Sequence, residues 1–171
     1  MFPLLIGLHV TAALVGFGAV ALSGTYGSTA ADLGRPGAGE EARRWFGRPN
    51  RAAWAVFAVP GLAVAALAAA GRTAELGQMW IDAALVLWLA AAALVALVVG
   101  PAEARLRRLV GGAGPNLGAT GPALEAGDPA LEAGDPALAR AAGRRLARAA
   151  ATCDLIFVVA LALMIWQPAW P

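Results

Sequence analysis

The chain has 171 residues, of which 60% are hydrophobic and 14% are charged, and its mean hydropathy is +0.67. Soluble domains are typically about half apolar, so this composition excludes an ordinary soluble domain and indicates a membrane protein. The net charge of +2 comes from arginines beside apolar runs, which favours membrane lipids rather than nucleic acid as partners. The single cysteine, Cys153, excludes an internal disulfide and a multi-cysteine metal site.

Four apolar segments are long enough to cross a bilayer. A helix needs about 20 predominantly apolar residues to span the hydrocarbon core, and each segment is close to that length. The sequence therefore predicts an all-α, polytopic membrane protein with a single domain, an antiparallel four-helix transmembrane bundle. The predicted spans are residues 2–24, 52–71, 80–100 and 149–166.

The first span contains the only histidine, His9. An ionisable ring in hydrocarbon has to turn toward protein or water, and at helical spacing His9 shares a face with Gly16 and Ser23. These small residues let another helix approach closely, so this face is predicted to look into the bundle. Gly18, on the opposite stripe, is a further candidate for helix packing.

The connection at residues 25–51 is polar and contains five arginines. Within it, the segment Glu40–Phe46 is either a short helix along the headgroups, with Trp45 and Phe46 in the interface, or a solvated loop. In the second span, Pro60 is expected to kink the helix because it has no N–H and its ring clashes with the preceding turn. Such a break is tolerated in a membrane only if neighbouring groups satisfy the freed carbonyl.

The third span follows a short turn and so forms a hairpin with the second. Asp82 lies just inside its start, and the arginine-rich residues after 100 are expected to continue the helix into the headgroups. The connection 101–148 then contains a tandem PALEAGD repeat at residues 122–135. Proline and glycine in every repeat exclude a continuous coiled coil, so the repeat is interpreted as a flexible, solvent-exposed linker.

The distribution of arginines predicts the orientation of the chain. The two long connections hold five and seven arginines, whereas the turn between the second and third spans holds only Arg72. Both long connections are therefore predicted to be cytoplasmic, with both termini outside an inner (plasma) membrane. The arginines expected at lipid headgroups are Arg43, Arg44, Arg48, Arg51, Arg105, Arg107, Arg108, Arg144, Arg145 and Arg148.

Three roles are open for His9. It is a hydrogen-bonded packing residue, an axial ligand of haem b, or a proton relay with Asp82 in the same half of the membrane. A second axial haem ligand would have to be Met164, water, or His9 of another subunit. For Asp82 and for Asp154, which lies near the opposite surface, helix capping or pairing with an arginine is the alternative to a functional role.

The motif LHVTAALVGFG at residues 8–18 resembles the opening helix of an uncharacterised family of four-helix bacterial integral membrane proteins. That resemblance covers the four-span layout in outline and implies no activity. More distantly, the first helix is similar to that of the copper resistance D proteins and the four-helix membrane protoporphyrinogen oxidases. The latter resemblance implies haem ligation by His9, although this chain has Gly16-Phe17-Gly18 where those proteins usually show a Trp before paired glycines, and it has no lysine.

The sequence thus supports three hypotheses. The first is a non-catalytic membrane protein that acts alone, as a homo-oligomer, or as an accessory subunit of a larger membrane assembly, because no nucleophile, base and orienting acid are visible together. The second is a haem-binding redox protein centred on His9. The third is a small transporter or channel, for which Pro60 and Asp82 are the only hints.

Overall fold

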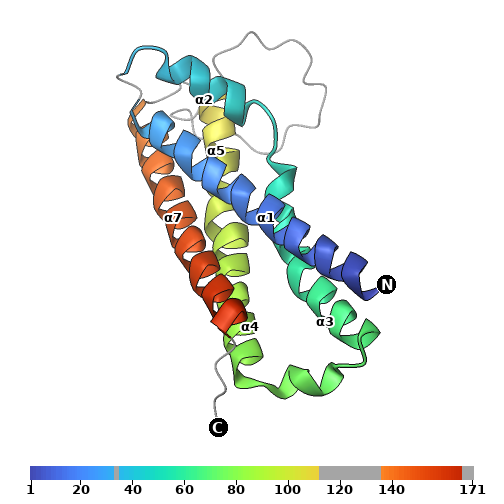
Figure 1. Cartoon of the computed structure of the whole chain (residues 1–171). Coiled ribbons are helices and arrows are strands. Elements are labelled where there is room, and N and C mark those ends of the chain that lie inside the picture. The colour runs from blue at the N-terminus through green and yellow to red at the C-terminus, as the bar shows by residue number, and fades with distance from the viewer. Residues whose placement is uncertain (33–34, 112–135, 167–171) are drawn as a thin grey trace, which may run out of the picture.

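The computed structural model describes residues 1–32, 35–111 and 136–166. Over these ranges the chain is helical and contains no strand, and four of its helices are long and apolar enough to cross a membrane. The protein is therefore an all-α multi-pass membrane protein, and its four spans run alternately up and down as an antiparallel bundle (Figure 1).

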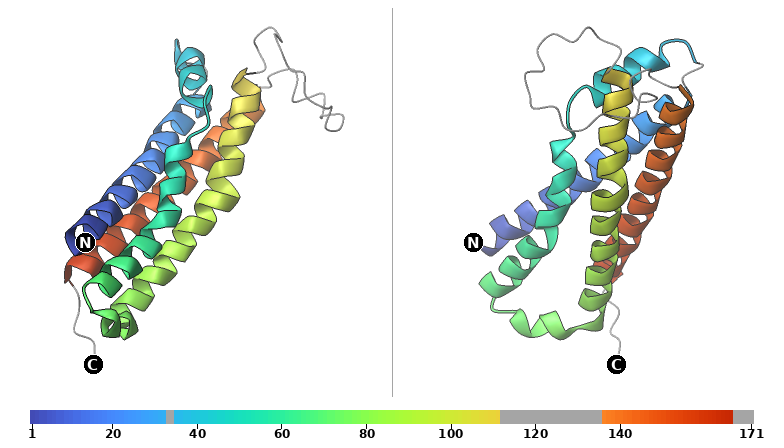
Figure 2. Two further views of the ribbon diagram at one scale, coloured as in Figure 1. Left: turned by 90° about the vertical axis from the view of Figure 1, so that its right-hand side faces the viewer. Right: turned by 180° about the vertical axis from the view of Figure 1, so that it is seen from behind.

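The four spans are joined at alternate ends of the bundle, and α1 and α7 each pack against a middle span. Figures 1 and 2 show α2, the end of α5 and the beginning of α7 together at one end of the bundle, which we call the α2 end. The opposite end carries η2, and we call it the η2 end. In chain order the elements are α1 (Phe2–Ala31), α2 (Ala38–Phe46), η1 (Arg51–Ala58), α3 (Val59–Ala69), η2 (Thr73–Gly77), α4 (Met79–Leu94), η3 (Val95–Val99), α5 (Gly100–Gly111) and α7 (Pro136–Trp166).

Both middle spans change their helical winding beside a proline. The second span is a 3₁₀ helix, η1, up to Ala58 and becomes the α-helix α3 around Pro60. In the third span, the N–H of Gly100 bonds to the carbonyl of Val95, which makes η3 a π turn just before Pro101. The break predicted at Pro60 is thus a change of winding, and α4, η3 and α5 form one continuous helix.

The first and last helices make the most extensive contact in the bundle. They cross where Gly27 of α1 faces Gly143 of α7, and a Cβ added to Gly143 would lie 2.5 Å from the carbonyl oxygen of Gly27 and 2.8 Å from the backbone nitrogen of Ala31. A Cβ at Gly24 would likewise meet Ala150. Because lipid tails are as apolar as the helices, such close backbone packing is a main source of association in a membrane.

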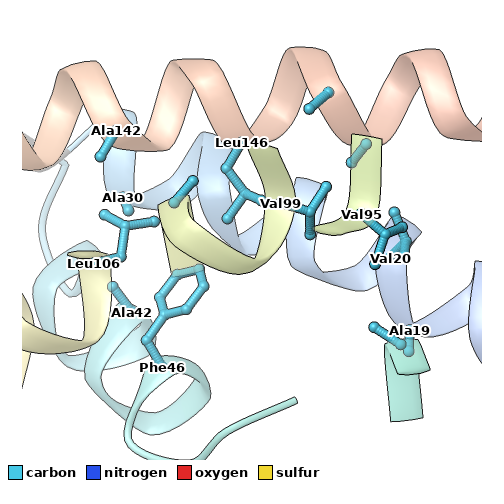
Figure 3. Close-up of a cluster of buried hydrophobic side chains, with 14 of the residues drawn as sticks. Ala19, Val20, Ala30, Ala42, Phe46, Val95, Val99, Leu106, Ala142 and Leu146 are labelled. Carbon is cyan, nitrogen blue, oxygen red and sulfur yellow. The ribbon is translucent and has the colours of Figure 1, made fainter. Parts of the chain in front are cut away.

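The hydrophobic core lies toward the α2 end. On α1 the buried residues begin at Gly16, and on α7 they end at Cys153. Figure 3 shows Leu106 of α5, Leu146 of α7 and Phe46 of α2 as parts of one buried cluster, with Leu146 beside Val99. Toward the η2 end, large apolar side chains of α1 and α7, such as Leu4 and Ile165, are exposed on the bundle surface, where acyl chains would contact them.

The short helix α2 packs across the ends of α1 and α5. Its Trp45 stacks on Tyr26 with ring centroids 4.4 Å apart, and Phe46 is only 3% exposed within the core. A helix is therefore present at residues 40–46, but the expectation that Phe46 dips into the membrane interface is wrong. Its apolar face is buried against protein.

The helices extend beyond the predicted spans at the α2 end. The predicted continuation of the third helix after residue 100 is confirmed, as far as Gly111. Helix α1 continues to Ala31 and α7 begins at Pro136, so both connections are shorter than the predicted 25–51 and 101–148. The PALEAGD repeats at 122–135 lie outside the described residues.

Candidate functional site

A buried polar cluster joins three segments near the α2 end. Ser23 of α1 and Glu103 of α5 are both buried, and the Ser23 hydroxyl donates a hydrogen bond to Oε1 of Glu103. Asn50, just before η1, places its Nδ2 atom 2.8 Å from Ser23 Oγ, 3.1 Å from the carbonyl oxygen of Ala19 and 3.4 Å from Glu103 Oε1. We call Ser23, Asn50 and Glu103 the carboxyl centre.

Arg107 lies one turn after Glu103 on the same helix. Its Nε atom is buried and has no hydrogen-bond partner among the described residues, and its positive charge acts on the Glu103 carboxyl without a close ion pair. Burying a carboxyl group is costly unless hydrogen bonds and opposite charge compensate for lost hydration. Ser23, Asn50 and Arg107 offset part of this cost, and the hydrogen bonds tie α1 and α5 to the segment before η1.

A second polar cluster surrounds the proline of the second span. In an α-helix the N–H of residue 60 would bond to the carbonyl of Val56, and Pro60 has no N–H to give. The Val56 oxygen accepts instead from the backbone N–H of Val59, at the end of η1, and from the indole Nε1 of Trp88 in α4 at 2.8 Å. A neighbouring helix thus donates to the carbonyl freed by Pro60, as expected, in addition to the bond that this carbonyl receives within its own span.

His9 belongs to this same cluster. Its Nδ1 atom lies 2.8 Å from the carbonyl oxygen of Val59, and the ring is half-buried between α1 and α3. Because a carbonyl only accepts, Nδ1 carries the proton in this bond and Nε2 of the neutral ring is left as an acceptor. We call His9, Val56, Val59, Pro60 and Trp88 the proline centre.

The role of Trp88 leads to a testable expectation. Trp88→Phe is expected to lower the free energy of unfolding by about 1 kcal/mol, because the Val56 carbonyl loses a donor inside the bundle. In a Pro60→Ala background the backbone N–H of residue 60 can reach that carbonyl, so the same change is expected to cost close to nothing. Thermal unfolding of the two single variants and the double variant in detergent measures the difference, and equal costs in both backgrounds would contradict it.

The other ionisable candidates stay apart from His9. Asp82 is exposed in the first turn of α4, and no described hydrogen bond or ion pair joins it to His9. Asp154 is half-buried on α7 and likewise has no described side-chain partner. Met164 is half-buried near the end of α7, which diverges from the beginning of α1 that carries His9 (Figure 1).

The residues predicted for helix packing divide into two groups. Gly16 packs against Val56, whose backbone nitrogen would lie 2.6 Å from an added Cβ, and Ser23 and Pro60 belong to the two centres. Gly18 is exposed, and an added Cβ would meet nothing within 4 Å, so Gly18 makes no helix contact within the described chain.

The arginines predicted at the headgroups lie toward the α2 end. Arg107 is the exception to their surface position, since part of its side chain is buried beside the carboxyl centre. The exposed ones are Arg43, Arg44, Arg48, Arg51, Arg105, Arg108, Arg144, Arg145 and Arg148.

Sequence reasoning did not find Asn50 or Glu103. Asn50 follows a proline in a polar connection, and Glu103 stands one turn before Arg107, which is the usual pattern of a solvated surface pair. A signal was present in the length of the third helix, since continuation to Gly111 places Glu103 within the packed part of the bundle. Among the described residues, no group of three or more His, Cys, Asp or Glu side chains is placed to hold a metal ion.

Comparisons with protein-family models, with curated proteins and with solved structures found no match for this chain. The resemblances of the first helix therefore stay predictions. The two polar centres and their place in the bundle are the basis of the functional assignment.

Proposed function

We propose that the chain is a non-catalytic, multi-pass protein of a bacterial inner membrane that acts as an accessory subunit of a larger membrane assembly. One observation carries this proposal: the polar side chains of both centres are used to hold segments together. His9 and Trp88 bond to backbone carbonyls of the interrupted second span, and the carboxyl centre connects α1, α5 and Asn50. Polar side chains that bond to other parts of the protein in this way stabilise the fold, and we infer that they do not take part in catalysis.

The orientation is part of the same proposal. The exposed arginines gather at the α2 end, and the turn at the η2 end holds Arg72, which pairs with Glu75 at 2.6 Å. Arginine in short connections is retained on the cytoplasmic side, so the α2 end faces the cytoplasm and both termini face outward. Reporter fusions after residue 171 check this, and a reporter that works only in the cytoplasm would reverse the assignment.

A surface for a partner is available at the η2 end. Before Gly16 on α1 and after Cys153 on α7, the chain buries no residue of these helices. A photo-crosslinking residue in place of the exposed Val158 on α7 is therefore expected to form a discrete protein adduct in native membranes. The same residue in place of Trp54, which is exposed on the second span, is the control, and adducts with lipid alone at both positions would contradict an accessory role.

A haem-binding redox protein is the second candidate, and the geometry of His9 favours it specifically. Histidines that bind metals usually donate their other ring N–H to a carbonyl or carboxylate, which fixes the ring and its tautomer. His9 makes this kind of bond from Nδ1 to the Val59 carbonyl, so its Nε2 is the nitrogen left to bind a metal. The chain would supply one axial ligand, and the second would come from water or from His9 of another copy, since the helix end carrying Met164 diverges from α1 (Figure 1).

Two substitutions of His9 distinguish the candidates. His9→Ala removes the bond to Val59 and is expected to lower the free energy of unfolding by about 1 kcal/mol. His9→Asn keeps an N–H donor near the position of Nδ1 but offers no equivalent of Nε2, so a structural role predicts that it recovers most of that loss. Thermal unfolding and the absorption spectrum of purified protein are measured together. A Soret band in wild type that both variants lose would replace the non-catalytic assignment with haem binding.

A further inference from the structure

A pocket of about 250 Å³ lies between α5 and α7 on the surface of the bundle, toward the α2 end. Its lining is apolar except for two arginines, Arg105 of α5 and Arg145 of α7. The apolar part includes Leu97 and Val98, which precede Arg105 by about two turns of the same continuous helix. The pocket is distinct from both polar centres.

The two arginines of the pocket are exposed and form no ion pair among the described residues. Other arginines do find carboxylates, as Arg35 does with Glu41 at 2.7 Å. No Asp or Glu lines the pocket, and the acid nearest in sequence to Arg105, Glu103, is buried and bonded to Ser23 and Asn50. Two neighbouring guanidinium groups that have no counter-charge among the described residues favour binding of an anion between them.

The order of residues along the pocket matches the shape of a phospholipid. Leu97 and Val98 lie nearer the middle of the third span, and Arg105 lies toward the α2 end, where the arginines of the chain gather. A guanidinium group presents planar, paired donors that match phosphate, and basic pockets between membrane helices are typical sites for anionic headgroups. An acyl chain attached to that phosphate would extend back over Leu97 and Val98.

We propose that this pocket binds one anionic phospholipid, with its phosphate held by Arg105 and Arg145 and an acyl chain lying along Leu97 and Val98. Because the pocket is bordered by both α5 and α7, the bound lipid links the two helices. This inference does not depend on the accessory role or on haem binding, since it concerns a different part of the bundle.

The experiment measures lipid binding to the purified, delipidated full chain. Phosphatidylglycerol is titrated and bound lipid is counted by native mass spectrometry, with phosphatidylcholine as the zwitterionic comparison. The test variant is Arg105→Ala with Arg145→Ala, and the matched control is Arg108→Ala with Arg144→Ala, which removes the same charge from exposed positions on the same two helices outside the pocket. The test variant is expected to bind phosphatidylglycerol about 25-fold more weakly, from about fivefold for each arginine. The control is expected to bind as wild type does.

A second variant leaves both charges in place. Ala141 is an exposed part of the lining, so Ala141→Trp fills the pocket from its surface and is expected to abolish the single tight site without loss of folding. If the variant that lacks both arginines fails to fold, Ala141→Trp still tests whether the pocket binds the lipid. The proposal is overturned if the control pair loses as much phosphatidylglycerol binding as the test pair, or if Ala141→Trp binds that lipid as wild type does. It is also overturned if wild type binds phosphatidylcholine as tightly as phosphatidylglycerol, or if inorganic phosphate alone stabilises the protein as much as the lipid does.

Discussion

Replacing Gly143 by alanine is expected to lower the free energy of unfolding of the bundle by about 3 kcal/mol. The new Cβ would lie 2.5 Å from the Gly27 oxygen and 2.8 Å from the Ala31 nitrogen, and both are backbone atoms that cannot rotate away. The helices α1 and α7 would have to separate, which weakens the most extensive contact in the structure. Thermal unfolding followed by circular dichroism in detergent measures the change.

Two glycines of α1 provide the matched comparison. A Cβ at Gly16 would lie 2.6 Å from the backbone nitrogen of Val56, whereas a Cβ at Gly18 would meet nothing within 4 Å. Gly16→Ala is therefore expected to destabilise the protein, and Gly18→Ala is expected to stabilise it slightly because alanine is the better helix former. If Gly143→Ala and Gly16→Ala cost no more than Gly18→Ala, the close helix contacts described here are contradicted.

Replacing Glu103 by alanine is expected to cost about 3 kcal/mol in unfolding free energy. The change leaves the buried hydroxyl of Ser23 without its acceptor, removes a hydrogen-bond acceptor from Asn50, and removes the carboxyl group on which the charge of Arg107 acts. A chemical unfolding titration in mixed detergent measures the loss.

The control for Glu103 is a glutamate on the surface. Glu40 pairs with Arg44 at 3.2 Å while both side chains are largely exposed, so Glu40→Ala is expected to cost less than about 0.5 kcal/mol. Combining Glu103→Ala with Asn50→Ala tests the network, because residues that share hydrogen bonds give less than the sum of their single effects. Additive costs would show that Asn50 and Glu103 act independently.

The transmembrane architecture was predictable because the bilayer imposes a local rule. Each span needs a long apolar helix whose backbone bonds are satisfied internally, and that requirement can be recognised one segment at a time. The end of the first helix was not predictable in this way. Helix α1 continues to Ala31 because Gly27 and Ala30 pack against α7 beyond the apolar run, which is a tertiary effect.

The candidate site was predictable only where its chemistry is local. Pro60 alone shows that a carbonyl needs another donor, but nothing near Pro60 identifies Trp88 as that donor. Likewise Asn50 and Glu103 each have the sequence context of a surface residue, and only the fold brings them together at Ser23. His9 was expected to face protein, and it does so against Val59 of the second span, while Asp82 stays exposed on α4.

The mutual packing of α1 and α7 has a consequence for biosynthesis. During translation α1 is made before the other three described spans, and its glycine surface meets its main partner only after α7, the last described helix, has been made. Contacts between segments so far apart along a chain form slowly, because the intervening loop has to close before they are gained. The insertion machinery therefore handles an incompletely assembled intermediate, and truncation before α7 is expected to leave a product that membrane proteases remove.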